Sequence, residues 1–303
     1  MNLDKYNLGE PILVAPSPTP FTKDDKVDHR AVESNAEKWL KTKLSGFVLG
    51  TENGEEQLLD LQEKLSICKT VSSVAKGKKL IIGGIDNPSP KNTILEAEEL
   101  VNAGVDLVRI RIPRRRDTID RYFDETLNRI PVPVLVIHQM APGGFSSSMT
   151  TIGADPDQIG RFCSHDNVFG YIASHLVRFE MMTRKFVPPE KQFWVPNGML
   201  MVSQVIEGAN GACFMLGNIA PKICKTIISL GLEGKFLEAK KLNDSIVDVD
   251  WNVLSSGAAG LKFALDLLGF EGGLPRSPLK ALSDSKRNLI RDSLNRAGIK
   301  KVE

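Results

Sequence analysis

Short apolar runs rich in β-branched residues recur along the chain, and segments with helical spacing of apolar residues lie between them. The runs occupy residues 11–16, 46–50, 79–84, 106–112, 133–138, 167–173, 192–197 and 211–216. Runs of this length and composition are typical of buried strands. The helical segments 55–76 and 91–104 end at Gly77 and Gly104, as helices before a glycine cap do. Strands that alternate with helices predict βαβ units and a parallel sheet.

Eight such units within about 220 residues favour a closed barrel over an open doubly wound sheet. The first strand is not followed by the GxGxxG turn that marks dinucleotide-binding folds. After the eighth run the spacing predicts helices at 221–230, 233–249, 251–268 and 283–296. The sequence therefore predicts an α/β protein, with a (β/α)8 TIM barrel at 1–224 and a C-terminal helical extension at 225–303 packed on the barrel.

Charge and cysteine content narrow the class of protein. The chain has 39 Lys+Arg against 37 Asp+Glu, a balance that argues against a nucleic-acid partner. We find no run of 18 apolar residues and no apolar core of a signal peptide at the N-terminus. The four cysteines lack metal-ligand spacing and lie mostly in apolar segments. We expect a cytoplasmic protein with reduced thiols that binds no membrane.

The run LVRIRIPRRR at 107–116 contains five arginines. Side chains alternate along a strand, so Arg109 and Arg111 share one face and the apolar residues share the other. Because the outer face of a barrel strand packs on apolar helices, we expect both arginines to point into the lumen. A buried guanidinium group needs a carboxylate partner or an anionic ligand. An internal salt bridge, for instance with Glu52, and ligand binding both remain open; residues 114–116 are expected to face solvent or another subunit.

Catalytic groups of such barrels project from the carboxyl ends of the strands. The second run ends in GTENGEE, where Thr51, Glu52 and Asn53 supply a hydroxyl, a carboxylate and an amide; a turn with a helix cap is the alternative interpretation. The fifth run ends at His138, which is either an acid–base group or a structural histidine. His175 is a secondary candidate for the same role.

Read in order, the motifs resemble the dihydrodipicolinate synthase and N-acetylneuraminate lyase family. The similarity covers PTPF at 18–21, GT-NGE at 50–55, IIGGIDNPS at 81–89, PVPVLVIH at 131–138, DNVFGYIAS at 166–174, GANGACFMLGNIAP at 208–221 and LKFALDLLGFEGGLPRSPL at 261–279. The resemblance implies a class I aldolase-type barrel, a lyase activity on a small 2-oxo acid, no cofactor, and a homo-oligomer, either a dimer or a tetramer.

The resemblance breaks at the residues with the most specific roles. The family forms an imine through a lysine in a G-I-K-[DE] pattern, where this chain has Ile172, which cannot do so. The tyrosine of the family's Y-N-x-P segment aligns with His138, and its second tyrosine falls near Arg114 or Arg115. The arginine that often follows meets 143–144, both glycine. Thr51 and Asn53 match the family's small polar pair, with Glu52 inserted between them.

Three hypotheses follow. The first is a lyase without imine chemistry, in which Arg109 and Arg111 hold the carboxylate of a small 2-oxo or hydroxy acid and His138 or Glu52 moves the proton. The alternative is a non-catalytic or regulatory protein that binds an anionic metabolite. The third is metal-assisted aldol chemistry with ligands from Glu52, Glu55 and His138, although no tight cluster of metal ligands supports it, so we expect no metal.

Overall fold

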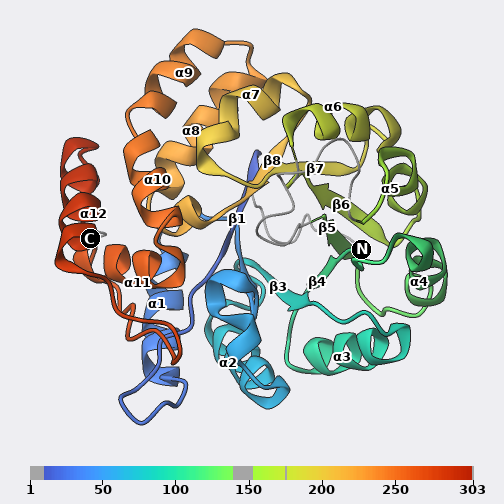
Figure 1. The fold of residues 1–303 in the computed structure, drawn as a ribbon, viewed down its shortest axis with the longest axis horizontal. Coiled ribbons are helices and arrows are strands. Elements are labelled where there is room, and N and C mark those ends of the chain that lie inside the picture. The colour runs from blue at the N-terminus through green and yellow to red at the C-terminus, as the bar shows by residue number, and fades with distance from the viewer. Residues whose placement is uncertain (1–9, 139–152, 175, 302–303) are drawn as a thin grey trace.

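Eight parallel strands close into a barrel in sequence order, with β1 paired to β8 (Figure 1). The computed structural model describes residues 10–138, 153–174 and 176–301. The strands are β1 (Ile12–Pro16), β2 (Gly46–Leu49), β3 (Leu80–Ile85), β4 (Leu107–Arg111), β5 (Val134–Ile137), β6 (Val168–Ile172), β7 (Gln192–Val195) and β8 (Gly211–Cys213). Each lies within or beside its predicted run, so the predicted barrel is confirmed.

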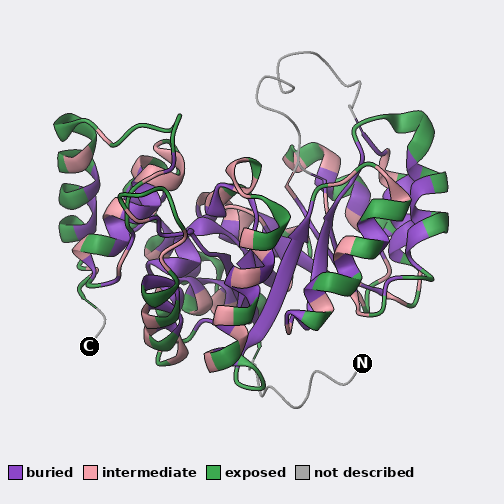
Figure 2. Ribbon diagram, turned by 90° about the horizontal axis from the view of Figure 1, so that it is seen from below, coloured by how far each residue is buried: buried purple, intermediate pink, exposed green. Residues whose placement is uncertain are grey.

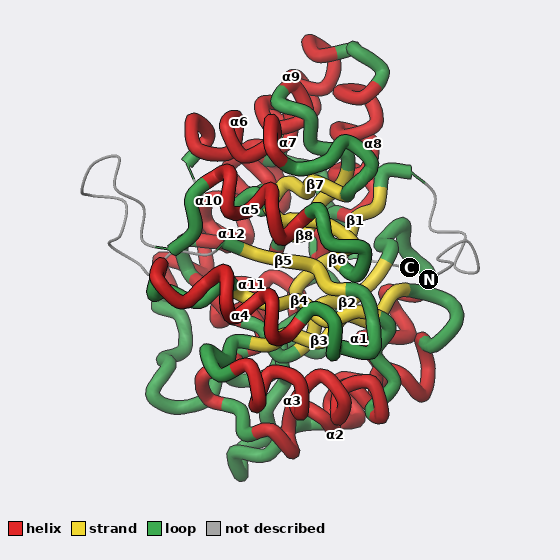
Figure 3. Tube along the Cα trace, turned by 90° about the vertical axis from the view of Figure 1, so that its right-hand side faces the viewer, coloured by secondary structure: helices red, strands yellow, loops and turns green. Residues whose placement is uncertain are grey.

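The strands separate two apolar layers, which is why each is buried on both faces (Figure 2). Side chains such as Val48, Leu107 and Ile172 fill the lumen, whereas Phe47, Val108 and Tyr171, their neighbours in sequence, pack outward in the larger core. The helices surround the strands on the outside (Figure 3). This alternation places every second residue of a strand inside the barrel.

The barrel helices alternate with the strands as predicted, but the start of one predicted helix, α2 (Leu61–Ala75), has to be corrected. They are α1 (His29–Leu40), α2 (Leu61–Ala75), α3 (Pro90–Asn102), α4 (Ile119–Thr126), α5 (Pro156–Cys163), α6 (Val177–Phe186), α7 (Met201–Ile206) and α8 (Pro221–Leu232). The helix predicted from residue 55 begins at Leu61, because Asp60 and Glu63 form a capping box there. Residues 52–58 form two short 3₁₀ turns instead. Gly77 and Gly104 have positive φ beyond α2 and α3, as predicted.

The C-terminal segment is helical, but it is divided more finely than the sequence predicted. After α8 come α9 (Phe236–Asp244), α10 (Val247–Leu254), α11 (Gly257–Leu267) and α12 (Asp284–Arg296). The single helices predicted at 233–249 and 251–268 are therefore wrong. The first is interrupted at Ser245 and Ile246, where Ile246 has a φ of −120° and a ψ of 1°. The second is interrupted at Ser255 and Ser256, and Gly257 after them has a φ of 59°. Apolar spacing continues across both breaks, so periodicity alone did not reveal them.

The extension lies against the barrel beside α1 (Figure 1). The side-chain amide of Asn35 donates to the carbonyl of Glu271, whose own N–H donates to Asn35 at 2.8 Å. The Arg30 guanidinium forms an ion pair with the Glu271 carboxylate at 2.8 Å. The domain boundary suggested at 224/225 falls inside α8, which packs on β1 as the eighth barrel helix.

Two other expectations concern cysteines and membranes. Cys68, Cys163, Cys213 and Cys224 are all buried and free of disulfides. Within the described ranges, none of the helices combines the length and apolar character that crossing a bilayer requires.

Candidate functional site

A cavity of about 550 Å³ lies at the carboxyl ends of the strands. Its polar lining residues are Thr51, Glu52, Asn53, Arg109, Ser174, Asn197 and Cys213. Its apolar lining residues are Pro16, Val48, Ile137, Ile172, Leu176, Val177, Pro196, Leu200, Phe214, Met215 and Leu254. Three of the predicted binding residues, from the β2 loop and β4, are therefore brought together on one cavity.

Arg109 and Arg111 are both buried, on the lumen side of β4 with Leu107. The Glu56 carboxylate lies between them, 3.3 Å from Arg109 Nη2 and 2.6 Å from Arg111 Nη2. Arg111 also forms an ion pair with Asp86, directly after β3. The internal salt bridges weighed from the sequence are present, but the carboxylates in these pairs are Glu56 and Asp86 rather than Glu52.

Arg109 retains a donor beyond its ion pair. Its Nη1 atom is buried and has no hydrogen-bond partner among the described protein atoms, and the residue lines the cavity. Burial lowers the pKa of Arg109, and the Glu56 carboxylate opposes that shift. A guanidinium group nevertheless stays protonated in proteins, so Arg109 presents a fixed positive charge to the cavity.

Thr51 adds a second polar atom of the same kind. Its Oγ1 is buried and without a hydrogen-bond partner in the described part of the chain. Gly84 of β3, paired in register with Arg109, lets the two side chains approach each other. A Cβ at Gly84 would lie 2.5 Å from Thr51 Cγ2 and 3.0 Å from Arg109 Nη2. Thr51 and Arg109 are thus neighbours at Gly84 through Cγ2 and Nη2, and each also has one unpartnered polar atom, Oγ1 and Nη1. A hydroxyl and a guanidinium N–H are both donors that suit a carboxylate group.

Ile172 ends β6 and lines the same cavity, with 1% of its surface exposed. Cys213, at the end of β8, lines it as well, and burial raises the pKa of its thiol to about 12 while Arg109 opposes the shift. The thiol is therefore protonated at neutral pH. Glu52 is exposed at the cavity wall, and Asn53 beside it is half-buried.

His138 is buried one residue after β5. Its ring lies 5.3 Å from that of Phe179 in α6, centroid to centroid. A Cβ at Gly153 would lie 2.4 Å from His138 Nε2. Of the described residues, His138 is not among those that line the cavity, so its proton-transfer role stays a prediction. His175 and residues 143–144 lie outside the described residues.

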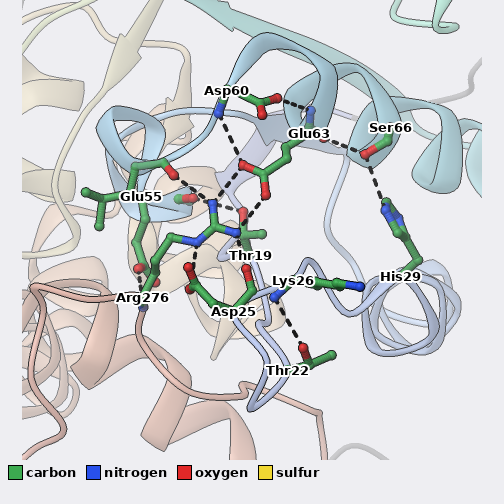
Figure 4. A network of polar contacts seen from close by, with 12 residues as sticks. Thr19, Thr22, Asp25, Lys26, His29, Glu55, Asp60, Glu63, Ser66 and Arg276 are labelled. Atoms are coloured by element: carbon green, nitrogen blue, oxygen red, sulfur yellow. Dashed lines mark hydrogen bonds and ion pairs between the residues drawn. The ribbon is translucent and has the colours of Figure 1, made fainter.

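The loop that carries Thr51 is held by the C-terminal extension. Glu55, in the left-handed conformation with a φ of 63°, forms a buried ion pair with Lys262 of α11 and accepts from the N–H of Arg276 at 2.8 Å. The Arg276 guanidinium binds both Glu63 oxygens, at 2.6 and 2.7 Å, and the Asp25 carboxylate at 3.0 Å (Figure 4). Residues of the extension thus fix the wall of the candidate site.

The same contacts bear on the metal hypothesis. Glu55, one of the three ligands considered, pairs with Lys262, and His138 packs on α6. Across residues 10–138, 153–174 and 176–301, no three His, Cys, Asp or Glu side chains group in the manner of a metal site.

Sequence reasoning missed Glu56, Asp86, Cys213 and Leu254. Asp86 could have been found, because it comes directly after the strand beside β4. Cys213 has the same signal at the end of β8. The position of Glu56 depends on the left-handed conformation of Glu55, and Leu254 comes from α10 of the extension. Neither residue is therefore marked as a site residue by the sequence around it.

Comparison with known proteins finds relatives that are similar to this chain over nearly its whole length. A 4-hydroxy-tetrahydrodipicolinate synthase of Archaeoglobus fulgidus is 23% identical over 91% of this chain and 94% of its own. A probable mitochondrial 4-hydroxy-2-oxoglutarate aldolase of Emericella nidulans is 24% identical over 94% of each chain.

Solved structures agree on the fold. The dihydrodipicolinate synthase (DHDPS) of Cyanidioschyzon merolae, solved with lysine bound, has a TM-score of 0.86 at 20% sequence identity. The match covers 95% of this chain and 98% of that chain. The prophage protein YagE of E. coli K12, solved with pyruvate, has a TM-score of 0.84 at 16% identity over 95% and 98%. The profile of the Dihydrodipicolinate synthetase family matches residues 10–297. The chain therefore belongs to the dihydrodipicolinate synthetase family.

Proposed function

We propose that the chain is a lyase-type protein that holds a small 2-oxo or hydroxy acid without forming an imine. The observation that carries this proposal is the pair of buried atoms without a hydrogen-bond partner, Thr51 Oγ1 and Arg109 Nη1, on one cavity. Buried polar atoms are normally hydrogen-bonded, so a pair beside an open cavity points to a ligand. A carboxylate that accepts from both atoms satisfies them.

The absence of an imine is proposed from Ile172. It occupies the position at which the resemblance places the family's lysine, and a hydrocarbon side chain has no nucleophilic atom. The cavity lining contains no lysine among the described residues. Without a covalent electron sink, negative charge that develops on the substrate must be stabilised electrostatically, and Arg109 is the fixed positive charge that faces it.

Proton transfer is assigned to Glu52 first. Its carboxylate belongs to the cavity lining next to Thr51, within the same 3₁₀ turn as Asn53. In carbon–carbon cleavage such a group can accept the proton of the substrate hydroxyl as the bond breaks, and return it to the carbanion that forms. In carbon–oxygen cleavage it can take the proton from the carbon next to the carbonyl, and return it to the departing hydroxide, which leaves as water. His138 is the second candidate. If neither is needed, the protein is the non-catalytic metabolite binder that the sequence also allows.

Two measurements test the proposal. Incubation with pyruvate and borohydride, followed by intact mass measurement, should leave the mass of the protein unchanged; a trapped adduct would contradict the proposed absence of an imine. A thermal-shift screen should show stabilisation by small carboxylates, because a ligand that binds the native state raises the melting temperature. Carbon–carbon or carbon–oxygen cleavage of the stabilising acids, measured for wild type, Glu52→Gln and His138→Ala, then separates a lyase from a binder.

We further propose a cytoplasmic location and a homo-oligomer, either a dimer or a tetramer. The four buried, unpaired thiols support the first. The family resemblance supports the second.

A further inference from the structure

The cavity has two chemically different walls. Thr51 lies two residues after β2 and Arg109 lies within β4, on either side of β3. In a closed eight-stranded barrel, β7 lies across from β3. The lining from β6 to β8 and from α10 has three polar residues, Ser174, Asn197 and Cys213, and is otherwise apolar: Ile172, Leu176, Val177, Pro196, Leu200, Phe214, Met215 and Leu254. A ligand that accepts from Thr51 and Arg109 therefore extends toward hydrocarbon.

The charges limit the ligand to one anionic group. Arg109 is the one cationic side chain among the described residues of the lining, and Glu52 is the one anionic side chain. Arg111 is not among the lining residues and pairs with both Glu56 and Asp86, so it supplies no second cation to the cavity. A second carboxylate or a phosphate on the ligand would share the cavity with Glu52 and find no further cation among the described lining residues.

The apolar wall disfavours a polyhydroxylated ligand. Hydroxyl groups placed against the buried side chains of Ile172, Phe214 and Met215 would lose hydrogen bonds to water and gain none from these side chains. A methylene chain in the same place gains free energy by leaving water. The cavity, at about 550 Å³, is also larger than a three-carbon acid requires.

We infer that the preferred ligand is an amphipathic monocarboxylate, a 2-oxo or 2-hydroxy acid whose apolar tail of several carbons packs on the β6–β8 wall. This inference rests on the proposed function and adds the substrate class. It excludes dicarboxylates and sugar acids as preferred ligands.

Isothermal titration calorimetry with pyruvate, 2-oxobutanoate, 2-oxopentanoate and 2-oxohexanoate tests the inference. Affinity should rise about fourfold for each added methylene, from the free energy of burying that group. 2-Oxoglutarate, matched in length to 2-oxopentanoate, should bind at least about tenfold more weakly. Leu254→Asn should weaken 2-oxohexanoate more than pyruvate, and Leu95→Asn, on a half-exposed residue of α3 outside the cavity lining, should leave the series unchanged.

The possible outcomes distinguish the inferred substrate class from the proposed function. Binding of pyruvate as tight as that of 2-oxohexanoate, or of 2-oxoglutarate as tight as that of 2-oxopentanoate, would overturn the substrate class and leave the proposed function standing. Failure of every acid to bind would overturn the proposed function, and the inference with it.

Discussion

Arg109 has two roles in the site, as a partner of Glu56 and as a donor to the cavity. Arg109→Met should abolish the rise in melting temperature caused by carboxylates, because the cavity loses its cation. Glu56 keeps its 2.6 Å ion pair with Arg111, so the variant should still fold. Thermal unfolding with and without acid measures both effects. Arg115→Met, which removes an exposed ion pair with Asp117, is the matched control; an equal response of both variants would remove Arg109 from the site.

Ile172 allows the reverse experiment, in which the missing nucleophile is introduced. A lysine at this buried position faces the cavity, and burial should lower its pKa so that part of it is the neutral amine. Ile172→Lys should therefore gain a borohydride-trapped pyruvate adduct, detected by intact mass and located by peptide mapping. Ile172→Met, of similar volume, should gain none. A lysine variant that folds but forms no adduct would show that the cavity does not hold a 2-oxo acid at β6.

At the scale of elements, the loop after β2 depends on α11. Lys262→Met should destabilise the fold by about 3 to 5 kcal/mol, because it leaves the Glu55 carboxylate buried without its cation. The double variant Lys262→Met with Glu55→Gln should recover part of that loss. Urea unfolding of the two single variants and the double variant gives the coupling energy. Additive effects would mean that the pair does not hold the loop.

The contact between α10 and the loop after β7 should respond to pH. Burial raises the pKa of Asp250 to about 6 from an ordinary value of 3.8, while the N–H of Met199 opposes the shift. Below pH 3.8 the group is protonated in both states and has no effect. As pH rises toward 6, the unfolded chain releases the proton more readily, so the free energy of unfolding falls.

Asp250→Asn removes this titration. The variant should gain stability over wild type between pH 4 and 6, approaching about 3 kcal/mol at pH 7. Chemical unfolding at several pH values measures the difference. Asp248→Asn, on an exposed residue of the same helix, is the control. Parallel stability curves for wild type and Asp250→Asn would contradict the assignment.

For the whole molecule, the barrel was predictable and the site only in part. The eight strands were found because each is buried on both faces and reads as a continuous apolar run. The direction of Arg109 followed from alternation along β4. The partner Glu56 was not predictable, because it depends on a left-handed residue at Glu55 and on contacts made by residues more than 200 positions away. Tertiary contacts of this kind leave no periodic pattern in the sequence.

The assembly is a prediction at the same scale. Large apolar side chains stay exposed on α6, α9 and α10, among them Met181, Leu237 and Trp251. Exposed apolar surface of this kind favours association. Sedimentation velocity at micromolar concentration should give a mass of two or four chains of 33.3 kDa. A single species with the mass of one chain would contradict the proposed homo-oligomer.

The ion pair between Glu55 and Lys262 also constrains how this chain can change over evolutionary time. A mutation that truncates the protein before α11 would remove Lys262 together with the backbone N–H of Arg276, both of which hold Glu55. The loop after β2 would then lose the contacts that fix its conformation. Lineages in which this loop still binds a ligand should therefore retain the last 50 or so residues or replace these contacts with others.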